Sequence, residues 1–220
     1  MKAMILAAGR GERLRPLTDT TPKSLVEVHG ESLLERHLKN IRRAGIEDVV
    51  INLGWLGEKI VARIGSGSNY DLNVVYSDEA DDVLETGGGI HKALALLGDE
   101  PFLVVNADVH TDMPVPNVPL ANDDMGHLCL VPSPSYRDGG DFDIEDGRIR
   151  NCDSQSLTFS GIAVYRPEFF AGCEAGRFSI VPMLREAADA GLLGGSLYQG
   201  HWADVGTPER LSACDARQSS

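Results

Sequence analysis

Residues 3–18 read AMILAAGRGERLRPLT, and this stretch decides the fold. It begins with an apolar run, Ala3 to Ala8, of the length of a buried strand. Gly9 and Gly11 follow at once, and glycine lets backbone N–H groups approach a phosphate without obstruction by a Cβ atom. Arg13, and Lys23 further on, would add positive charge for a polyphosphate. The stretch therefore predicts a strand that runs into a phosphate-binding loop.

The loop differs from two familiar phosphate-binding patterns. It lacks the G-x-x-x-x-G-K-[ST] spacing of a Walker loop, and Leu14 stands where a dinucleotide fingerprint requires its third glycine. Two glycines alone are also compatible with an ordinary turn that carries solvated arginines. The decision between these readings depends on the rest of the chain.

Along the chain, apolar runs of strand length alternate with segments of helical period. We expect further strands at 49–53, 72–76, 102–106, 158–165 and 196–200, a hairpin at 142–149, and helices at 33–44, 56–64, 90–97, 180–190 and from 208 onward. Such alternation is typical of βαβ units. It predicts a single α/β domain with a Rossmann-like, central mixed and mostly parallel sheet flanked by helices, and ligands at the carboxyl ends of the strands.

Length and charge restrict the possible functions. The 220 residues suffice for one core but not for two full domains. Asp and Glu number 33 against 20 Lys and Arg, a net charge of −13 without a basic cluster, which argues against nucleic acid or an anionic membrane as partner. The four cysteines show no C-x-x-C spacing, and no apolar run resembles a signal peptide or a membrane span, so we expect a cytoplasmic protein.

The complete opening motif is more specific than its glycines. L-A-A-G-x-G-x-R-L-x-P-L-T, followed by P-K-x-L at 22–25, resembles the signature of the sugar-1-phosphate nucleotidylyltransferases. The resemblance continues through LETGGG at 84–89, VVNADV at 104–109, TFSGI at 158–162 and HWADVGTP at 201–208. In so short a chain, this combination is similar to the N-acetylmuramate-1-phosphate uridylyltransferases of bacterial peptidoglycan recycling. The resemblance implies an enzyme that joins UTP and N-acetylmuramate 1-phosphate to give a nucleotide sugar and pyrophosphate.

The resemblance also implies which residues bind the nucleotide. Residues 1–110 would form a nucleotide-binding half and residues 111–220 a sugar-phosphate-binding half of one catalytic domain. The implied nucleotide ligands are Gly11, Glu12, Arg13, Lys23, Thr86 and Gly87. Arg13 would contact the leaving pyrophosphate and Lys23 the α-phosphate. The glycines at 87–89 are equally compatible with a mere flexible start of a helix.

A magnesium site is expected at Asp108, which we count with Arg13 and Lys23 as catalytic. Asp108 follows the apolar run 102–106, at the strand end where an open α/β sheet binds its ligands. Mg²⁺ prefers one or two carboxylates together with phosphate oxygens, and the resemblance assigns the second carboxylate to Asp204. The alternative, that Asp204 caps the last helix, is less attractive because Thr207 directly precedes Pro208.

The sugar-phosphate ligands implied by the resemblance are Asn106, Gly140, Asp141 and Gly161. Trp202 could offer its ring to the sugar or pack in the core. Many relatives hold the sugar phosphate with a lysine, but residues 136–142 contain none, and Arg137 could replace it. The acidic run at 78–82 is interpreted as solvated loop surface.

Three alternatives remain open. A mannose-1-phosphate guanylyltransferase would share the opening motif, and a molybdopterin nucleotidyltransferase fits less well because its lysine follows the glycine loop more closely. A non-catalytic nucleotide-sugar sensor would not require Arg13, Lys23, Asp108 and Asp204 together. We expect a monomer or a small homo-oligomer.

Overall fold

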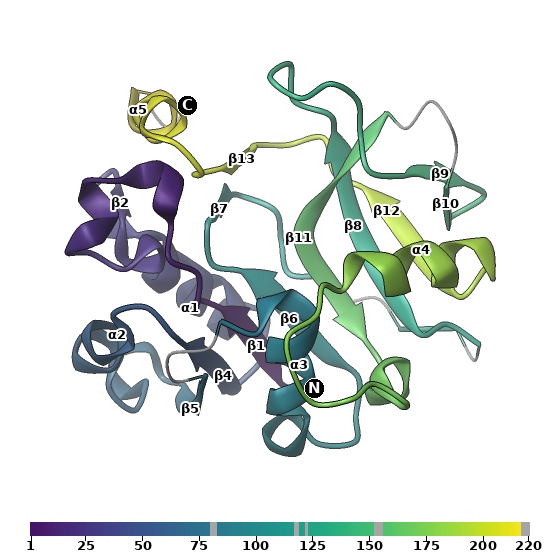
Figure 1. Cartoon of the computed structure of the whole chain (residues 1–220), viewed down its shortest axis with the longest axis horizontal. Helices are drawn as coiled ribbons and strands as arrows, with labels where there is room; N and C mark the ends of the chain where they lie inside the picture. Colours follow the sequence, from purple (N-terminus) through teal and green to yellow (C-terminus); the bar gives the residue numbers. More distant parts are fainter. Residues whose placement is uncertain (80–82, 117–118, 122, 152–155, 217–220) are drawn as a thin grey trace.

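The computed structural model describes residues 1–79, 83–116, 119–121, 123–151 and 156–216. Within these residues, a central sheet has the strand order β5-β4-β1-β6-β11-β8-β12-β10-β9 (Figure 1). Its strands are β1 (Ala3–Leu6), β4 (Asp48–Leu53), β5 (Asn73–Asp78), β6 (Phe102–Asn106), β8 (Gly126–Pro132), β9 (Asp143–Glu145), β10 (Arg148–Arg150), β11 (Leu157–Tyr165) and β12 (Leu193–Leu197). The helices are α1 (Leu33–Arg43), α2 (Gly57–Ile64), α3 (Glu85–Leu97), α4 (Val181–Asp189) and α5 (Pro208–Ala216).

The sheet is mixed, as the sequence predicts. β1 pairs in parallel with β4 and β6, β4 pairs in parallel with β5, and β12 pairs in parallel with β8. β11 runs antiparallel to both β6 and β8. It therefore connects the strands of residues 1–110 with those of residues 111–220 in one sheet. Two small antiparallel sheets of two strands each lie outside it: β2 (Glu27–Val28) with β3 (Glu31–Ser32), and β7 (Val109–Thr111) with β13 (Trp202–Asp204).

Helices cover both faces of the sheet because the strands are apolar on both. In β1, Ala3 and Ile5 pack with residues of α1 and α2, whereas Met4 packs with residues of α3. All three side chains have no exposed surface. This two-sided burial is the reason why the strands read as continuous apolar runs in the sequence.

Two elements begin three or more residues before their predicted start, and glycines pack closely in both. α3 begins at Glu85 rather than at 90, because Gly87 and Gly88 lie directly against residues 176–178. A Cβ atom at Gly87 would lie 2.4 Å from Phe178 Cε2. The strand expected at 196–200 is β12 at Leu193–Leu197, where a Cβ atom at Gly195 would lie 2.4 Å from Ile149 Cδ1. Close packing thus overrides the low helix and strand propensity of glycine.

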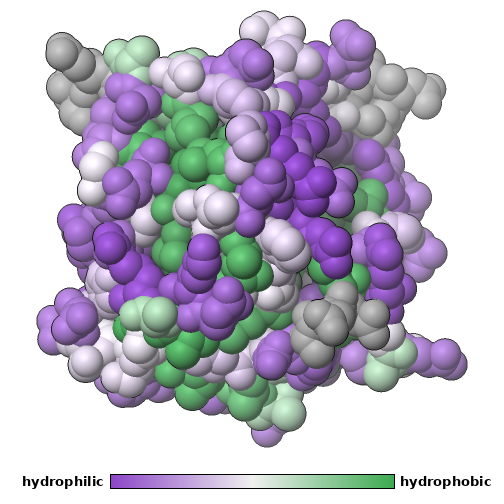
Figure 2. All heavy atoms as spheres, turned by 60° about the vertical axis from the view of Figure 1, so that its left-hand side comes forward, coloured by the Kyte–Doolittle hydropathy of each residue, from purple (hydrophilic) through white to green (hydrophobic). Residues whose placement is uncertain are grey.

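The face that carries α2 and the amino-terminal loops is mainly polar. Figure 2 shows this side, with hydrophilic residues over most of it and hydrophobic residues gathered between them. None of the helices in the described parts of the chain combines the length and apolar character needed to cross a bilayer.

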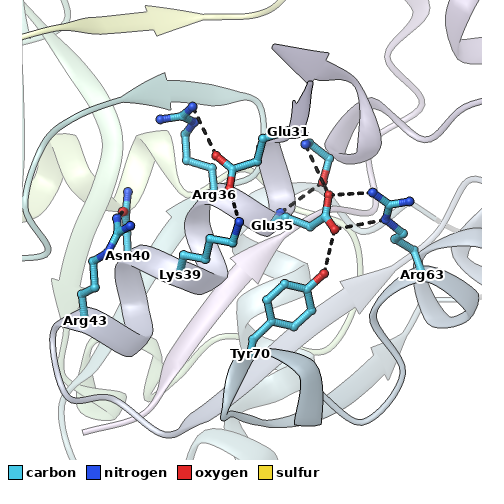
Figure 3. Close-up of polar contacts among 9 residues, drawn as sticks. Glu31, Glu35, Arg36, Lys39, Asn40, Arg43, Arg63 and Tyr70 are labelled. Atoms are coloured by element: carbon cyan, nitrogen blue, oxygen red, sulfur yellow. Dashed lines mark hydrogen bonds and ion pairs between the residues drawn. The ribbon is translucent and has the colours of Figure 1, made fainter. Parts of the chain in front are cut away.

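Glu35 connects the start of α1 to α2 (Figure 3). Its backbone N–H donates to Ser32 Oγ (3.2 Å) and its carboxylate accepts from Ser32 N (3.3 Å), which makes a capping box. The carboxylate also accepts from Arg63 Nε and Nη2 (both 3.1 Å) and from Tyr70 Oη (2.8 Å). Burial alone would raise the pKa of Glu35, but the hydrogen bonds from Arg63, Ser32 and Tyr70 outweigh it and lower this pKa to about 2.

We expect Glu35→Ala to lower the free energy of unfolding at pH 7 by about 1–2 kcal/mol, because it removes the carboxylate half of the capping box and the bonds to Arg63 of α2 and to Tyr70. Since the pKa is lower in the folded state than its ordinary 4.5, the contribution of Glu35 is complete above that pH and is lost as the pH falls toward 2. Denaturant titrations should therefore show the difference from wild type shrinking over this range.

Glu31→Ala is the matched control for this experiment. Glu31 pairs with Arg36 (3.2 Å) and Lys39 (2.6 Å), which both belong to α1 itself (Figure 3). Surface ion pairs contribute little, so a loss below about 0.5 kcal/mol is expected. An equal loss in the two variants would contradict the role given to Glu35.

Candidate active site

A cleft of about 1140 Å³ opens at the carboxyl ends of β1 and β6. Its walls are the loop after β1, the turn at Lys23 and Ser24, the end of β6 and the start of α3. Gly176, Arg177 and Gly206 close it from the second half of the chain. The cleft lies where the sequence predicts ligand binding, at the strand ends of an open α/β sheet.

The glycine loop is folded tightly over the cleft. Gly11 has φ +62°, and a Cβ atom there would lie 2.9 Å from Thr18 Cγ2, so the position favours glycine. Thr18 Oγ1 donates to Gly11 O (2.8 Å), and Trp55 Nε1 donates to Thr18 O (2.9 Å). This folding brings Glu12 and Arg13 to the cleft wall, where both are exposed.

Lys23 and Asp108 meet in the cleft. Lys23 Nζ lies 2.5 Å from Asp108 Oδ2, although 85 positions separate them in the chain. The Lys23 side chain is 14% exposed and that of Asp108 32%, so the pair is shielded on one side and open to a ligand on the other. The expected phosphate-binding cation and the expected metal ligand are thus in direct contact.

Asp204 lies beside Asp108 through the backbone. β13 pairs with β7 so that Asp204 is opposite Val109, and Val205 N donates to Asp108 O (2.8 Å). The Asp204 carboxylate, however, is held by Arg210, whose Nη1 lies 2.8 and 2.7 Å from its two oxygens. The residues that line the cleft include Asp108 but not Asp204.

These donors fit a cation that is shared with a substrate. In the described part of the chain, no group of three or more His, Cys, Asp or Glu side chains could hold a metal ion without other ligands. One or two carboxylates facing a phosphate-binding loop match the preference of Mg²⁺, which takes its remaining oxygens from phosphates and water.

Thr207 Oγ1 accepts from Arg210 N (3.4 Å), so Thr207 takes the capping position that the sequence assigned to it.

Of the two residues expected to contact the base, the structure brings one to the cleft. Thr86 lines it, in the first turn of α3. Gly87 is buried against Phe178, and the neighbouring Gly88 N donates to Phe178 O (3.1 Å). The glycines of this segment therefore allow close backbone packing.

The four expected sugar-phosphate ligands lie in two places. Asn106 lines the cleft, and its Nδ2 would lie 2.6 Å from a Cβ atom at Gly161, which has φ +79° in the bulge of β11. Gly140 and Asp141 are not among the cleft-lining residues. Asp141 accepts from Phe159 N (2.9 Å) and pairs with Arg137 (2.9 Å). Asp141 and Arg137 are thus held at the start of β11.

Of the two roles considered for Trp202, the structure shows packing against the core, with part of the residue still exposed. Its Nε1 donates to Ser160 O (2.9 Å), and its ring packs against the core.

The interpretation of residues 78–82 as solvated surface is wrong for Glu79. This carboxylate is only 3% exposed and lines the cleft together with Asn52, which is also 3% exposed. Residues 80–82 lie outside the described residues. The sequence signal for Asn52 was its place inside the apolar run 49–53, where a polar side chain requires a buried partner.

Comparison with known proteins decides the family. The sequence profile described as nucleotidyl transferase matches residues 2–124. The chain belongs to the nucleotidyl transferase family. This nucleotidyltransferase is 46% identical, over 98% of its length and 97% of the relative, to the N-acetylmuramate alpha-1-phosphate uridylyltransferase of Neisseria meningitidis serogroup B. It is 36% identical, over 98% of its length and 96% of the relative, to the protein of the same name from Caulobacter vibrioides.

A solved structure supports the fold of this nucleotidyltransferase. It superposes with a TM-score of 0.86 on a putative glucose-1-phosphate thymidylyltransferase from Bacillus anthracis, crystallised with sucrose. The match covers 98% of the chain and 94% of that protein at 21% identity. The family resemblance inferred from the sequence motifs is confirmed.

Proposed function

We propose that this nucleotidyltransferase transfers the uridylyl group of UTP to N-acetylmuramate 1-phosphate, in peptidoglycan recycling in the cytoplasm. The identity of the sugar and of the base rests on the two uridylyltransferases that match over nearly the whole chain. The reaction type is carried by one observation, the contact of Lys23 with Asp108 beside the glycine loop. A phosphate-binding cation and a metal-binding carboxylate are what phosphoryl chemistry requires in one place.

In the proposed reaction, an oxygen of the sugar phosphate attacks the α-phosphorus of UTP, and the bond to the leaving pyrophosphate breaks. The backbone N–H groups of Gly11 and Glu12 and the guanidinium group of Arg13 hold the β- and γ-phosphates at the cleft wall. Lys23 binds the α-phosphate and stabilises the charge that develops on it. Bound Mg²⁺, for which Asp108 and Asp204 are the proposed ligands, would neutralise phosphate charge.

The other proposed contacts follow the division of the chain. Residues 1–110 supply the nucleotide site, with Thr86 and Gly87 at the base, and they also supply most of the cleft lining. Residues 111–220 contribute Gly140, Asp141 and Gly161, and Asn106 joins them from the end of β6. This division is supported by the side chain of Asn106 lying both on the cleft and against Gly161.

Measuring pyrophosphate release with Mg²⁺, each of the four nucleoside triphosphates and a panel of sugar 1-phosphates tests the proposal. We expect release to be fastest with UTP and N-acetylmuramate 1-phosphate. Preference for GTP and mannose 1-phosphate would instead identify a guanylyltransferase. If UTP binds and no combination releases pyrophosphate, the chain is a sensor and the proposed reaction is wrong.

A further inference from the structure

Glu79 is a buried carboxylate that the proposed reaction does not use. It directly follows β5, where its backbone N–H donates to Leu53 O (2.9 Å), and it is among the residues that line the cleft. Burying a carboxylate is costly unless its oxygens receive hydrogen bonds. Its retention at the cleft therefore requires an explanation in terms of its contacts.

Glu79 is part of a chain of hydrogen bonds that joins two walls of the cleft. Ala7 N, at the start of the glycine loop, donates to Asn52 Oδ1 (2.6 Å). Asn52 Nδ2 donates to Glu79 Oε1 (2.7 Å), and Leu84 N, immediately before α3, donates to Glu79 Oε2 (2.9 Å). The chain thus connects the phosphate loop to the segment that carries Thr86.

The charge of Glu79 fixes the direction of this chain. Both Glu79 oxygens accept, so Asn52 must present its amide NH₂ to Glu79 and its carbonyl oxygen to Ala7. The site is also fitted closely around the carboxylate. A Cβ atom at Gly89 would lie 2.6 Å from Glu79 Oε1 and 3.0 Å from Asn52 Nδ2.

We propose that Glu79 is a positioning residue that sets nucleotide affinity and base selectivity, an inference that rests on the proposed function. It holds the start of α3 at a fixed separation from the phosphate loop. A nucleotide spans both walls, with its phosphates on the loop and its base near Thr86. A fixed separation therefore favours the binding of a nucleotide whose base fits at that position and disfavours the binding of the others.

The first test is Glu79→Gln, which is isosteric but turns one of the two acceptors into an NH₂ donor. That donor must then face either Asn52 Nδ2 or Leu84 N, and one buried contact is lost. We expect the Kd for UTP to rise about tenfold and the ratio of Kd values for CTP and UTP to fall by a similar factor. Calorimetry measures both. In turnover, the change should appear in KM more than in kcat.

The complementary variant Asn52→Asp/Glu79→Gln restores every bond with the charge moved to position 52. One oxygen of the new carboxylate accepts from Ala7 N, the other accepts from the amide NH₂ of the new side chain at 79, and the amide oxygen there accepts from Leu84 N. We expect affinity and base selectivity to return to within about threefold of wild type. Asn52→Asp alone places two carboxylates next to each other. This variant should therefore bind UTP less tightly and less selectively than the wild type.

Asp124→Asn is the matched control, a carboxylate-to-amide change at a site that is 7% exposed and outside the cleft. Asp124 accepts from Arg148 Nη1 and from Ala121 N, so its loss should lower the melting temperature and leave base selectivity unchanged.

If Glu79→Gln does not fold, Gly89→Ala gives the same test. It displaces the Glu79 carboxylate while raising helix propensity, and it too should reduce base selectivity.

Wild-type selectivity in Glu79→Gln, or in Gly89→Ala where the former does not fold, would overturn the proposal. A loss of affinity equal for all nucleotides, which the complementary variant leaves uncorrected, would also overturn it. Because Kd values for nucleotides are measured without the sugar phosphate, this result is separate from the proposed reaction. If the wild-type protein binds UTP selectively but releases no pyrophosphate, the proposed reaction is wrong. The role of Glu79 is still decided by the Kd values of its variants.

Discussion

Asp108→Asn is expected to lower kcat/KM for pyrophosphate release at least about 100-fold. The asparagine keeps the size of the side chain but removes its negative charge, which is proposed to bind Mg²⁺. In the structure this carboxylate contacts Lys23, with 2.5 Å between Asp108 Oδ2 and Lys23 Nζ. The measurement is the steady-state rate as a function of Mg²⁺ concentration. The concentration that gives half the maximal rate should also rise, because one carboxylate ligand is missing.

Asp112→Asn is the control for this prediction. Asp112 is close in sequence, but it pairs with Tyr198 Oη and is not among the cleft-lining residues. Its rate should stay within about threefold of wild type, since it contacts no reacting group. A loss below tenfold for Asp108→Asn, or an equal loss in both variants, would remove Asp108 from the proposed site.

Lys23→Ala is expected to cause a loss of similar size, at least about 100-fold in kcat/KM. The Lys23 side chain is 14% exposed and lines the cleft, so the charge developing on the α-phosphate would lose the cation that is proposed to stabilise it. The comparison is Lys39→Ala, which removes a lysine of α1 that pairs with Glu31 of β3, outside the cleft. That variant should keep wild-type rates, and a loss below tenfold for Lys23→Ala would argue against the proposed role.

The double variant Lys23→Ala/Asp108→Asn shows whether the two residues act as a unit. Groups that act together give losses that are far from additive. Since Lys23 and Asp108 are in contact, we expect the double variant to lose less than the product of the two single losses. A loss equal to that product would mean that the two side chains contribute independently.

Hydrophobic periodicity predicted the elements well where packing follows a simple rule. β6 lies at Phe102–Asn106 as expected, because every residue but the last is buried on a sheet covered from both sides. α1 also matches, with Ser32 as its cap. These elements are specified by local apolar spacing and capping, which can be read from the sequence.

The parts that the sequence did not predict depend on contacts between distant segments. The low helix propensity of the glycines at 87–89 led to a predicted helix start at 90, whereas Gly87 and Gly88 pack closely against residues 176–178 inside α3. Glu79 looked solvated because it stands in an acidic run, whereas its partners Asn52 and Leu84 come from other elements. By contrast, the ion pair of Asp204 with Arg210 joins positions only six apart, and it depends on the turn between β13 and α5.

Arg137 remains the expected substitute for the lysine that many relatives use on the sugar phosphate. Its guanidinium pairs with both oxygens of Asp141 (3.1 and 2.9 Å) and contacts Thr158 Oγ1 (3.4 Å). Binding a sugar phosphate there would require Arg137 to exchange or share these partners.

The fate of the α-phosphorus tests the central claim most directly. UTP labelled at that atom is incubated with Mg²⁺, N-acetylmuramate 1-phosphate and the protein, and the products are separated. We predict that the label appears in the nucleotide sugar while the released pyrophosphate stays unlabelled. Label that remains in UTP, or that appears in UMP without any nucleotide sugar, would contradict the assignment of uridylyl transfer to this cleft.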